Sequence, residues 1–137
     1  MYKRQGLDSI KYGQAEVRQT DHTFSTLSLS SLDRQINEVR LENGLKALKP
    51  SACAKKTAEI RAKEIEVKLD HYRPNGEYFD TAIPCKYEEA GENLAVAYEE
   101  GFNVVEEWLN SPTHKAVILN PVYEYVGSYQ NLSLIHI

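Results

Sequence analysis

The pattern of apolar and polar positions predicts helices over much of the chain from residue 30 onward. Ser30 and Asp33 form a capping-box variant at the start of a first helix, and Gly44 suits the position just after its end. A second helix is expected after Pro50, because apolar residues recur there every three or four positions. We expect this apolar stripe to face the core. It consists of Ala54, Ala58, Ala62, Ile65 and Leu69.

Two further helices and a strand are predicted in the second half of the chain. Trp108 belongs to a third apolar stripe, which is broken at Ser111 and Pro112, where serine suits an N-cap and proline suits the first helical position. The short helix that follows ends before Pro121. Residues 122–129 are rich in tyrosine and valine, so we expect a strand there.

The two ends of the chain differ from its middle. Residues 1–29 are mostly polar and show no sustained period, which is typical of a linker. Residues 1–5 and 133–137 resemble translated sequencing-adapter DNA, so we hypothesise that the chain is an internal fragment of a longer gene. We therefore expect a polar linker or non-native N-terminus at 1–29, one domain at 30–130 and a non-native tail at 131–137.

Composition narrows the classes of protein that fit. A chain of 137 residues with 42% hydrophobic residues suits one globular domain rather than a disordered chain. Its formal net charge of −4 argues against broad nucleic-acid binding, which needs a basic face. No stretch approaches the roughly 18 consecutive apolar residues that cross a bilayer, so no membrane span is expected in this chain.

Cys53 and Cys85 are the two cysteines, and they lie far apart in the sequence without forming a CxxC motif. A disulfide between them would stabilise the fold by about 3.5–4 kcal/mol in the chain-entropy account. In a reducing compartment they would instead be two small core residues. The residues themselves leave both alternatives open.

Three titratable residues lie beside turn signals rather than on amphipathic faces: His71, Glu92 and His114. Two neutral imidazoles and a carboxylate can bind a divalent ion such as zinc, or do acid–base work on a bound water. No local metal-binding spacing such as HExxH accompanies them. The alternative is that each histidine makes a hydrogen bond at a helix end and that Glu92 bonds to the backbone.

Other residues around this set fit more than one role. Ser111 could form a nucleophile–base pair with His114, although an N-cap explains the serine better. Trp108 is expected in the core, with a pocket wall as the alternative. Ser111, Trp108 and Asn93 are the residues we expect as possible pocket lining. A cluster of aromatic residues fits either the core or a binding groove: Tyr78, Phe79 and Tyr87.

These segments, in this order, resemble the CAP superfamily. It comprises cysteine-rich secretory proteins, antigen 5 and pathogenesis-related 1 proteins, and it includes a bacterial SCP-like branch. The similarity covers about residues 30–130. The segments that carry it are Ile36–Arg40, Gly44–Leu45, Leu48, Arg61–Ile65, His71–Gly76, Gly91–Ala95, Trp108–His114, Ile118–Pro121 and Val126–Gly127.

The resemblance implies an α+β fold, a three-layer α-β-α sandwich with a small antiparallel sheet. The family normally continues past Val126 and Gly127 through a further strand, so we expect the last strand to be missing here. The resemblance also implies a central cavity able to hold a divalent ion such as zinc. Its first histidine falls on His71, its glutamate on Glu92 and its second histidine on His114, but its second glutamate falls on Ser111, so the family tetrad is incomplete.

For function, the resemblance favours a binding module. Most relatives are secreted or surface-exposed, so we expect an extracellular or cell-surface domain of bacterial type whose ligand is a lipid, a wall polymer or a protein. One alternative is a divalent-metal-dependent, peptidase-like hydrolase that uses the same cavity, with Glu92 acting on water. Another is a structural surface domain with an inert cavity. The partial tetrad and the lack of an evident nucleophile make us lean against an enzyme.

Overall fold

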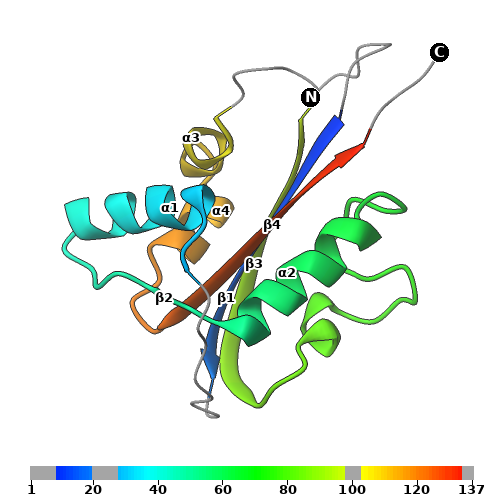
Figure 1. Cartoon of the computed structure of the whole chain (residues 1–137), viewed down its shortest axis with the longest axis horizontal. Coiled ribbons are helices and arrows are strands. Elements are labelled where there is room, and N and C mark those ends of the chain that lie inside the picture. Colours follow the sequence, from blue (N-terminus) through cyan, green and yellow to red (C-terminus); the bar gives the residue numbers. More distant parts are fainter. Residues whose placement is uncertain (1–8, 20–27, 98–102, 134–137) are drawn as a thin grey trace.

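The computed structural model describes residues 9–19, 28–97 and 103–133. Its strands are β1 (Ser9–Gln19), β2 (Lys49–Pro50), β3 (Tyr87–Ala97) and β4 (Tyr125–Ser133), and they form one sheet in the order β2-β4-β1-β3. On one side of the sheet lie α1 (Ser31–Glu42), α3 (Val104–Leu109) and α4 (Pro112–Ile118) (Figure 1). On the other side lie α2 (Ala52–Glu64) and the 3-10 helix η1 (Phe79–Ala82) (Figure 1). The predicted α+β class is confirmed.

Strand β1 is the largest departure from expectation, because we predicted a linker over residues 1–29. It pairs antiparallel with β3 on one side and with β4 on the other. Pairing on both sides gives the backbone N–H and C=O groups of β1 hydrogen-bond partners. A polar segment can therefore form a strand here although its side chains show no strong periodicity. That the last strand of the family fold is missing stays a prediction; in this sheet β1 lies beside β4. The remaining boundaries of the domain stay a prediction.

The predicted antiparallel sheet is right for three strands and wrong for the fourth. β2 pairs in parallel with β4, with Lys49 opposite Tyr125 and Pro50 opposite Val126, so the sheet is mixed. The non-native origin expected for both chain ends stays a prediction; of residues 1–5 and 133–137, Ser133 alone lies in the described part.

Helix α1 begins and ends as its sequence predicts. The Ser30 hydroxyl accepts a hydrogen bond from the Asp33 backbone N–H at 3.0 Å, and Asp33 Oδ2 accepts one from the Ser30 backbone N–H at 3.1 Å. Both bonds satisfy N–H groups that the helix itself leaves unpaired. Gly44 follows the helix with a φ of 75°, a conformation that favours glycine.

Helix α2 buries its alanine stripe but ends earlier than predicted. Ala54, Ala58, Ala62 and Ile65 are buried, whereas Leu69 is exposed. The difference arises because the backbone N–H groups of Glu66 and Val67 donate to carbonyls only three residues earlier, so the last turn tightens and the helix ends before Leu69. The apolar pattern therefore continues past the point where the helix stops.

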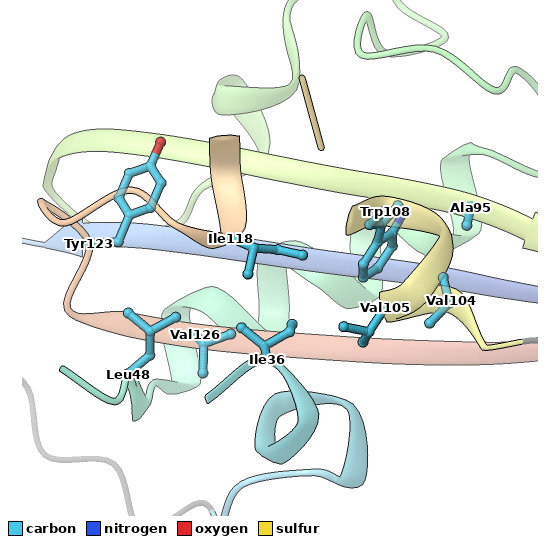
Figure 2. Packing of buried hydrophobic residues seen from close by; sticks show 9 residues of the cluster. All are labelled: Ile36, Leu48, Ala95, Val104, Val105, Trp108, Ile118, Tyr123 and Val126. Carbon is cyan, nitrogen blue, oxygen red and sulfur yellow. The ribbon is translucent and has the colours of Figure 1, made fainter. Parts of the chain in front are cut away.

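The main hydrophobic core lies between the sheet and α1, α3 and α4. Figure 2 shows Trp108 of α3 lying over the strands, and its indole N–H donates to the Leu94 carbonyl at 3.1 Å. The prediction of Trp108 as a core residue is confirmed. The buried cluster consists of Ile36, Leu48, Ala95, Val104, Val105, Trp108, Ile118, Tyr123 and Val126 (Figure 2).

Cys53 and Cys85 are joined by a disulfide, with their Cα atoms 6.0 Å apart. The bond links the first turn of α2 to the segment just before β3. The sequence left open whether the two cysteines form a disulfide or are separate core residues, and the structure has the disulfide.

Helix α2 packs directly on the backbone of the sheet at Gly127. A Cβ atom there would overlap backbone atoms of Ala54 and Lys55, which cannot move without shifting the helix. We expect Gly127→Ala to lower the free energy of unfolding by about 3 kcal/mol, the upper end for overpacking. Urea unfolding followed by the fluorescence of Trp108 measures it.

Gly44→Ala is the matched control for that substitution. No heavy atom lies within 4 Å of a Cβ built at Gly44. The substitution therefore lowers the free energy of unfolding by about 1 kcal/mol, the cost of a left-handed backbone conformation for alanine. An equal loss of stability in the two variants would contradict the close approach of α2 to the sheet at Gly127.

Candidate functional site

A cavity of about 280 Å³ lies beside β3, at the edge of the sheet. Its walls come from the segment after α2 with η1, from β3 itself and from α4. All three residues predicted to share a site, His71, Glu92 and His114, line this cavity. The structure thus brings together side chains that are far apart in the sequence.

Glu92 and Asn93 explain why the cavity sits at the sheet edge. We expected Glu92 to lie beside a turn, but Gly91, Glu92 and Asn93 all lie within β3. Successive side chains of a strand point to opposite faces of the sheet. Glu92 accordingly meets Arg61 of α2, whereas Asn93 donates to the His114 carbonyl of α4 at 3.1 Å. A cavity lined by both residues must reach around the edge of β3.

Arg61 holds the carboxylate of Glu92 in a buried ion pair. Its Nε donates to Oε1 and its Nη2 to Oε2, both at 3.1 Å, a two-pronged geometry typical of arginine and carboxylate. The two side chains are only 1% and 2% exposed. Burial acts to lower the pKa of Arg61, but its hydrogen bonds with Glu92 and Glu64 raise it overall, so the guanidinium stays charged.

His71 is oriented by the same carboxylate. Its Nδ1 lies 2.9 Å from Glu92 Oε2, and because a carboxylate only accepts, Nδ1 carries the hydrogen. That assignment leaves Nε2 as the ring atom available to a ligand or a proton. The hydrogen bond to Glu92 raises the pKa of His71. About half of the imidazole, 46%, is exposed to solvent.

His114 lies across the cavity in a different environment. Burial lowers the pKa of its imidazole, and the positive charge of His71 lowers it further. The two histidines therefore differ in charge preference although they share one cavity. Near neutral pH the arrangement offers one imidazole held by a carboxylate and one that stays neutral.

The donor set does not fit a zinc centre built from His71, Glu92 and His114. Both oxygens of Glu92 already accept hydrogen bonds from Arg61, and one also faces His71. In the described part of the chain, no group of three or more histidine, cysteine, aspartate or glutamate side chains is placed to hold a metal ion. Glu92 acts here as a positioning residue for His71, as carboxylates beside functional histidines commonly do.

Of the three residues expected as possible pocket lining, one lines the cavity. Asn93 lines the cavity, whereas Ser111 and Trp108 do not: Trp108 is packed in the core, and Ser111 lies at the N-cap position of α4. The Ser111 side chain makes no cap hydrogen bond, and its Oγ lies 3.3 Å from Thr113 Oγ1.

Sequence reasoning missed the role of Arg61. The signal was present, because a charged residue stands on the alanine face of α2, one position before Ala62. A charge on a buried face needs a partner of opposite sign. Tyr78 and Phe79, which fitted either a core or a groove, line the cavity, whereas the Tyr87 hydroxyl donates to Asp80 Oδ2 at 2.9 Å.

We expect the two cavity histidines to titrate on opposite sides of the ordinary imidazole pKa of about 6.5. Because the pKa of His71 is raised in the folded state, its contribution to stability is complete below about pH 6.5 and is lost as the pH rises through the folded pKa. His114 has a lowered pKa, so its protonation opposes folding as the pH falls. The imidazole Cε1–H signals in an NMR titration measure both values.

Glu92→Gln is expected to lower the pKa of His71, since the carboxylate is the main cause of its rise. Glu89→Gln serves as the control, because Glu89 is exposed on the same strand. A His71 pKa that is unchanged by Glu92→Gln would contradict the hydrogen bond as its cause.

Comparison with known proteins shows the family of the chain. The sequence profile of the cysteine-rich secretory protein family, CAP, matches residues 34–129, a range that includes all three cavity residues. The chain belongs to the CAP family. Strand β1 lies outside the part of the CAP domain that the family profile matches.

Two Bacillus subtilis proteins are similar to this CAP chain. It is 31% identical to the uncharacterized protein YkwD over 123 residues, which cover 82% of this chain and 48% of YkwD. It is 44% identical to the uncharacterized membrane protein YlbC over 41 residues, which cover 30% of this chain and 12% of YlbC. The chain thus spans about half of YkwD and a small part of YlbC. No solved structure matches it.

Within the described residues of this CAP chain, none of the helices has the length and apolar character needed to cross a membrane.

Proposed function

We propose that this CAP chain is a secreted or surface-exposed binding module whose ligand enters the cavity beside β3. The observation that carries the proposal is the fixed orientation of His71. A buried pair, Arg61 and Glu92, holds its Nδ1, so that Nε2 is the ring atom left for a ligand. Binding sites commonly combine a mostly apolar hollow with a few oriented polar groups of this kind.

Export is supported by two independent features. The disulfide between Cys53 and Cys85 belongs to a class of bond that persists mainly in oxidising compartments. The family is described as one of secretory proteins. We further propose that the two helical layers around the sheet in Figure 1 correspond to the three-layer sandwich of the family, and that the protein is bacterial like its Bacillus relatives.

The ligand classes in question are wall polymers, lipids and proteins, and one probe of each tests the proposal. Chitohexaose, a long-chain fatty acid and an unstructured oligopeptide are added in turn while NMR follows the imidazole signals of His71 and His114. We expect one probe to shift both signals in a saturable manner. A panel in which no probe shifts either signal would favour a structural domain with an inert cavity.

A pair of substitutions on α4 locates the binding. Thr113 lines the cavity and Lys115 does not, although both are exposed on the same helix. Thr113→Trp is expected to block binding by filling the cavity, whereas Lys115→Trp leaves it unchanged. Equal binding in the two variants would contradict the cavity as the site.

A hydrolase that uses a divalent metal is the second candidate. It is favoured by the two imidazoles, because His71 and His114 line one cavity and each could serve as a zinc ligand. Glu92 as it stands would not be the third ligand, since Arg61 occupies its carboxylate. Zinc titration of the wild type against the His71→Ala, His114→Ala double variant tests this. Equal affinity in both proteins removes the metal site, and peptide turnover that is lost in Glu92→Gln would support the enzyme.

A further inference from the structure

A row of aromatic rings runs from solvent to the mouth of the cavity. The ring centroids of Tyr72 and Tyr78 lie 5.1 Å apart, those of Tyr78 and Phe79 lie 4.9 Å apart, and those of Phe79 and His71 lie 6.5 Å apart. Each pair meets edge to face, an arrangement that aromatic rings prefer. Three of these residues, His71, Tyr78 and Phe79, also line the cavity.

The backbone that carries this row is held in place. Tyr72 and Tyr78 form a β-bridge, and between them the Arg73 backbone N–H donates to the Glu77 carbonyl at 2.7 Å. The Arg73 side chain pairs with Glu64 of α2 at 2.9 Å, and this fixes the turn against the helix. A surface whose shape is set before binding loses less conformational entropy when a ligand arrives.

Two rings of this row are presented to solvent. Tyr72 is 52% exposed and Tyr78 is 45% exposed. Tyrosine offers a flat apolar face together with a polar hydroxyl, which is why it is common where proteins bind partly polar ligands. The exposed pair therefore extends the aromatic surface outward from the cavity, as two rings inclined to each other.

Asn93 lines the cavity and carries an acceptor that nothing in the described part of the chain uses. Asn93 is fully buried, and its Oδ1 has no hydrogen-bond partner there. The assignment of its amide atoms is fixed, because Nδ2 donates to the His114 carbonyl, which only accepts. A buried acceptor without a partner costs free energy. Oδ1 is closed to solvent, so an O–H or N–H group of a ligand would reach it after a small shift of the side chain and would then be stabilised there.

At a pH above the pKa of His71, the charge of the cavity favours a neutral ligand. The negative charge of Glu92 is already balanced by Arg61 in a buried ion pair, so it is not free to bind a cation. None of the lining residues in the described part of the chain is a lysine or an arginine that would attract an anion. At about 280 Å³, the cavity is just smaller than typical ligand pockets, which span about 300–1,000 Å³, and it suits one end of a longer molecule.

We propose that the cavity and its aromatic row bind a neutral saccharide, one sugar unit entering the cavity and the next lying on Tyr78 and Tyr72. The apolar C–H face of a sugar ring packs on an aromatic face, and its hydroxyl or acetamido groups supply the donor that Asn93 Oδ1 lacks. This inference rests on the proposed function and narrows it to one ligand class.

Calorimetric titration with two neutral hexasaccharides tests the inference. Chitohexaose carries acetamido N–H groups and cellohexaose carries hydroxyl groups alone, so the pair shows which donor the site prefers. We expect at least one to bind the wild type, and Tyr72→Ala and Tyr78→Ala each to weaken that binding about tenfold or more. Leu41→Ala is the control: Leu41 is also an exposed apolar residue, 61% exposed, but it lies on α1 and its loss leaves affinity unchanged.

The outcomes separate this inference from the proposed function. If neither saccharide binds but the fatty acid or the peptide shifts the histidine signals, the saccharide inference is overturned and the binding module stands. If no probe of any class binds, both fall. Saccharide binding that is equal in the wild type and in both tyrosine variants would also overturn the aromatic row as the site.

Discussion

Arg61→Ala is expected to destabilise the fold by about 3–5 kcal/mol, because it leaves the carboxylate of Glu92 buried without its partner. Both side chains are almost completely buried, so the carboxylate lies away from bulk solvent. The same substitution removes the hydrogen bond that Arg61 donates to the Asp70 carbonyl, just before His71. Urea unfolding at neutral pH measures the loss of stability.

Two further variants show whether the buried charge is the cause. Lys63→Ala removes a cation from the same helix, but the ion pair of Lys63 with Glu59 is exposed, so little change in stability is expected. The double variant Arg61→Met, Glu92→Met removes both charges and is expected to be more stable than Arg61→Met alone. A double variant as unstable as the single one would contradict this account.

Removal of the disulfide is expected to cost about 3.5–4 kcal/mol, through the conformational freedom that the unfolded chain gains. The effect is large because Cys53 and Cys85 are 32 residues apart, so the bond closes a long loop in the unfolded chain. Urea unfolding of the Cys53→Ala, Cys85→Ala variant against the wild type measures it.

A reducing agent provides the matched control for this prediction. It should lower the stability of the wild type to about that of the double variant and leave the double variant unchanged. If the reducing agent has no effect on the wild type, the link between these cysteines in solution is contradicted.

The helices were predictable because each carries its own signals. The capping box at Ser30 and Asp33, and the alanine stripe from Ala54 to Ala62, are local features that fix where a helix begins and which face it buries. Leu69 shows the limit of such a pattern. Its spacing continues the stripe, but α2 ends in a tightened last turn, which the sequence does not display.

Strand β1 could not be predicted from its own residues. The stretch from Ile10 to Val17 contains apolar residues but no clean alternation, and Gly13 lies in its middle. What makes it a strand is pairing with β3 and β4, which come from the far half of the chain. Interactions of this kind override weak local preference.

The cavity was only partly predictable. Its three titratable residues could be named from the family resemblance, and the structure brings them to one cavity. The role of Glu92 in orienting His71 could not be predicted, because it depends on Arg61, which approaches Glu92 from a different element. The sequence spacing between these two residues gives no sign of the contact, which arises because α2 covers the face of the sheet toward which Glu92 points.

The position of β1 also sets a limit on how far this protein can be shortened. The family profile begins at residue 34, whereas an inner strand of the sheet comes from residues 9–19. A version trimmed to the family boundary would leave β3 and β4 without the strand that joins them, each with a row of free peptide groups. Such rows recruit other chains, so the trimmed protein is expected to self-associate, and binding measurements are best made on a chain that keeps its upstream residues.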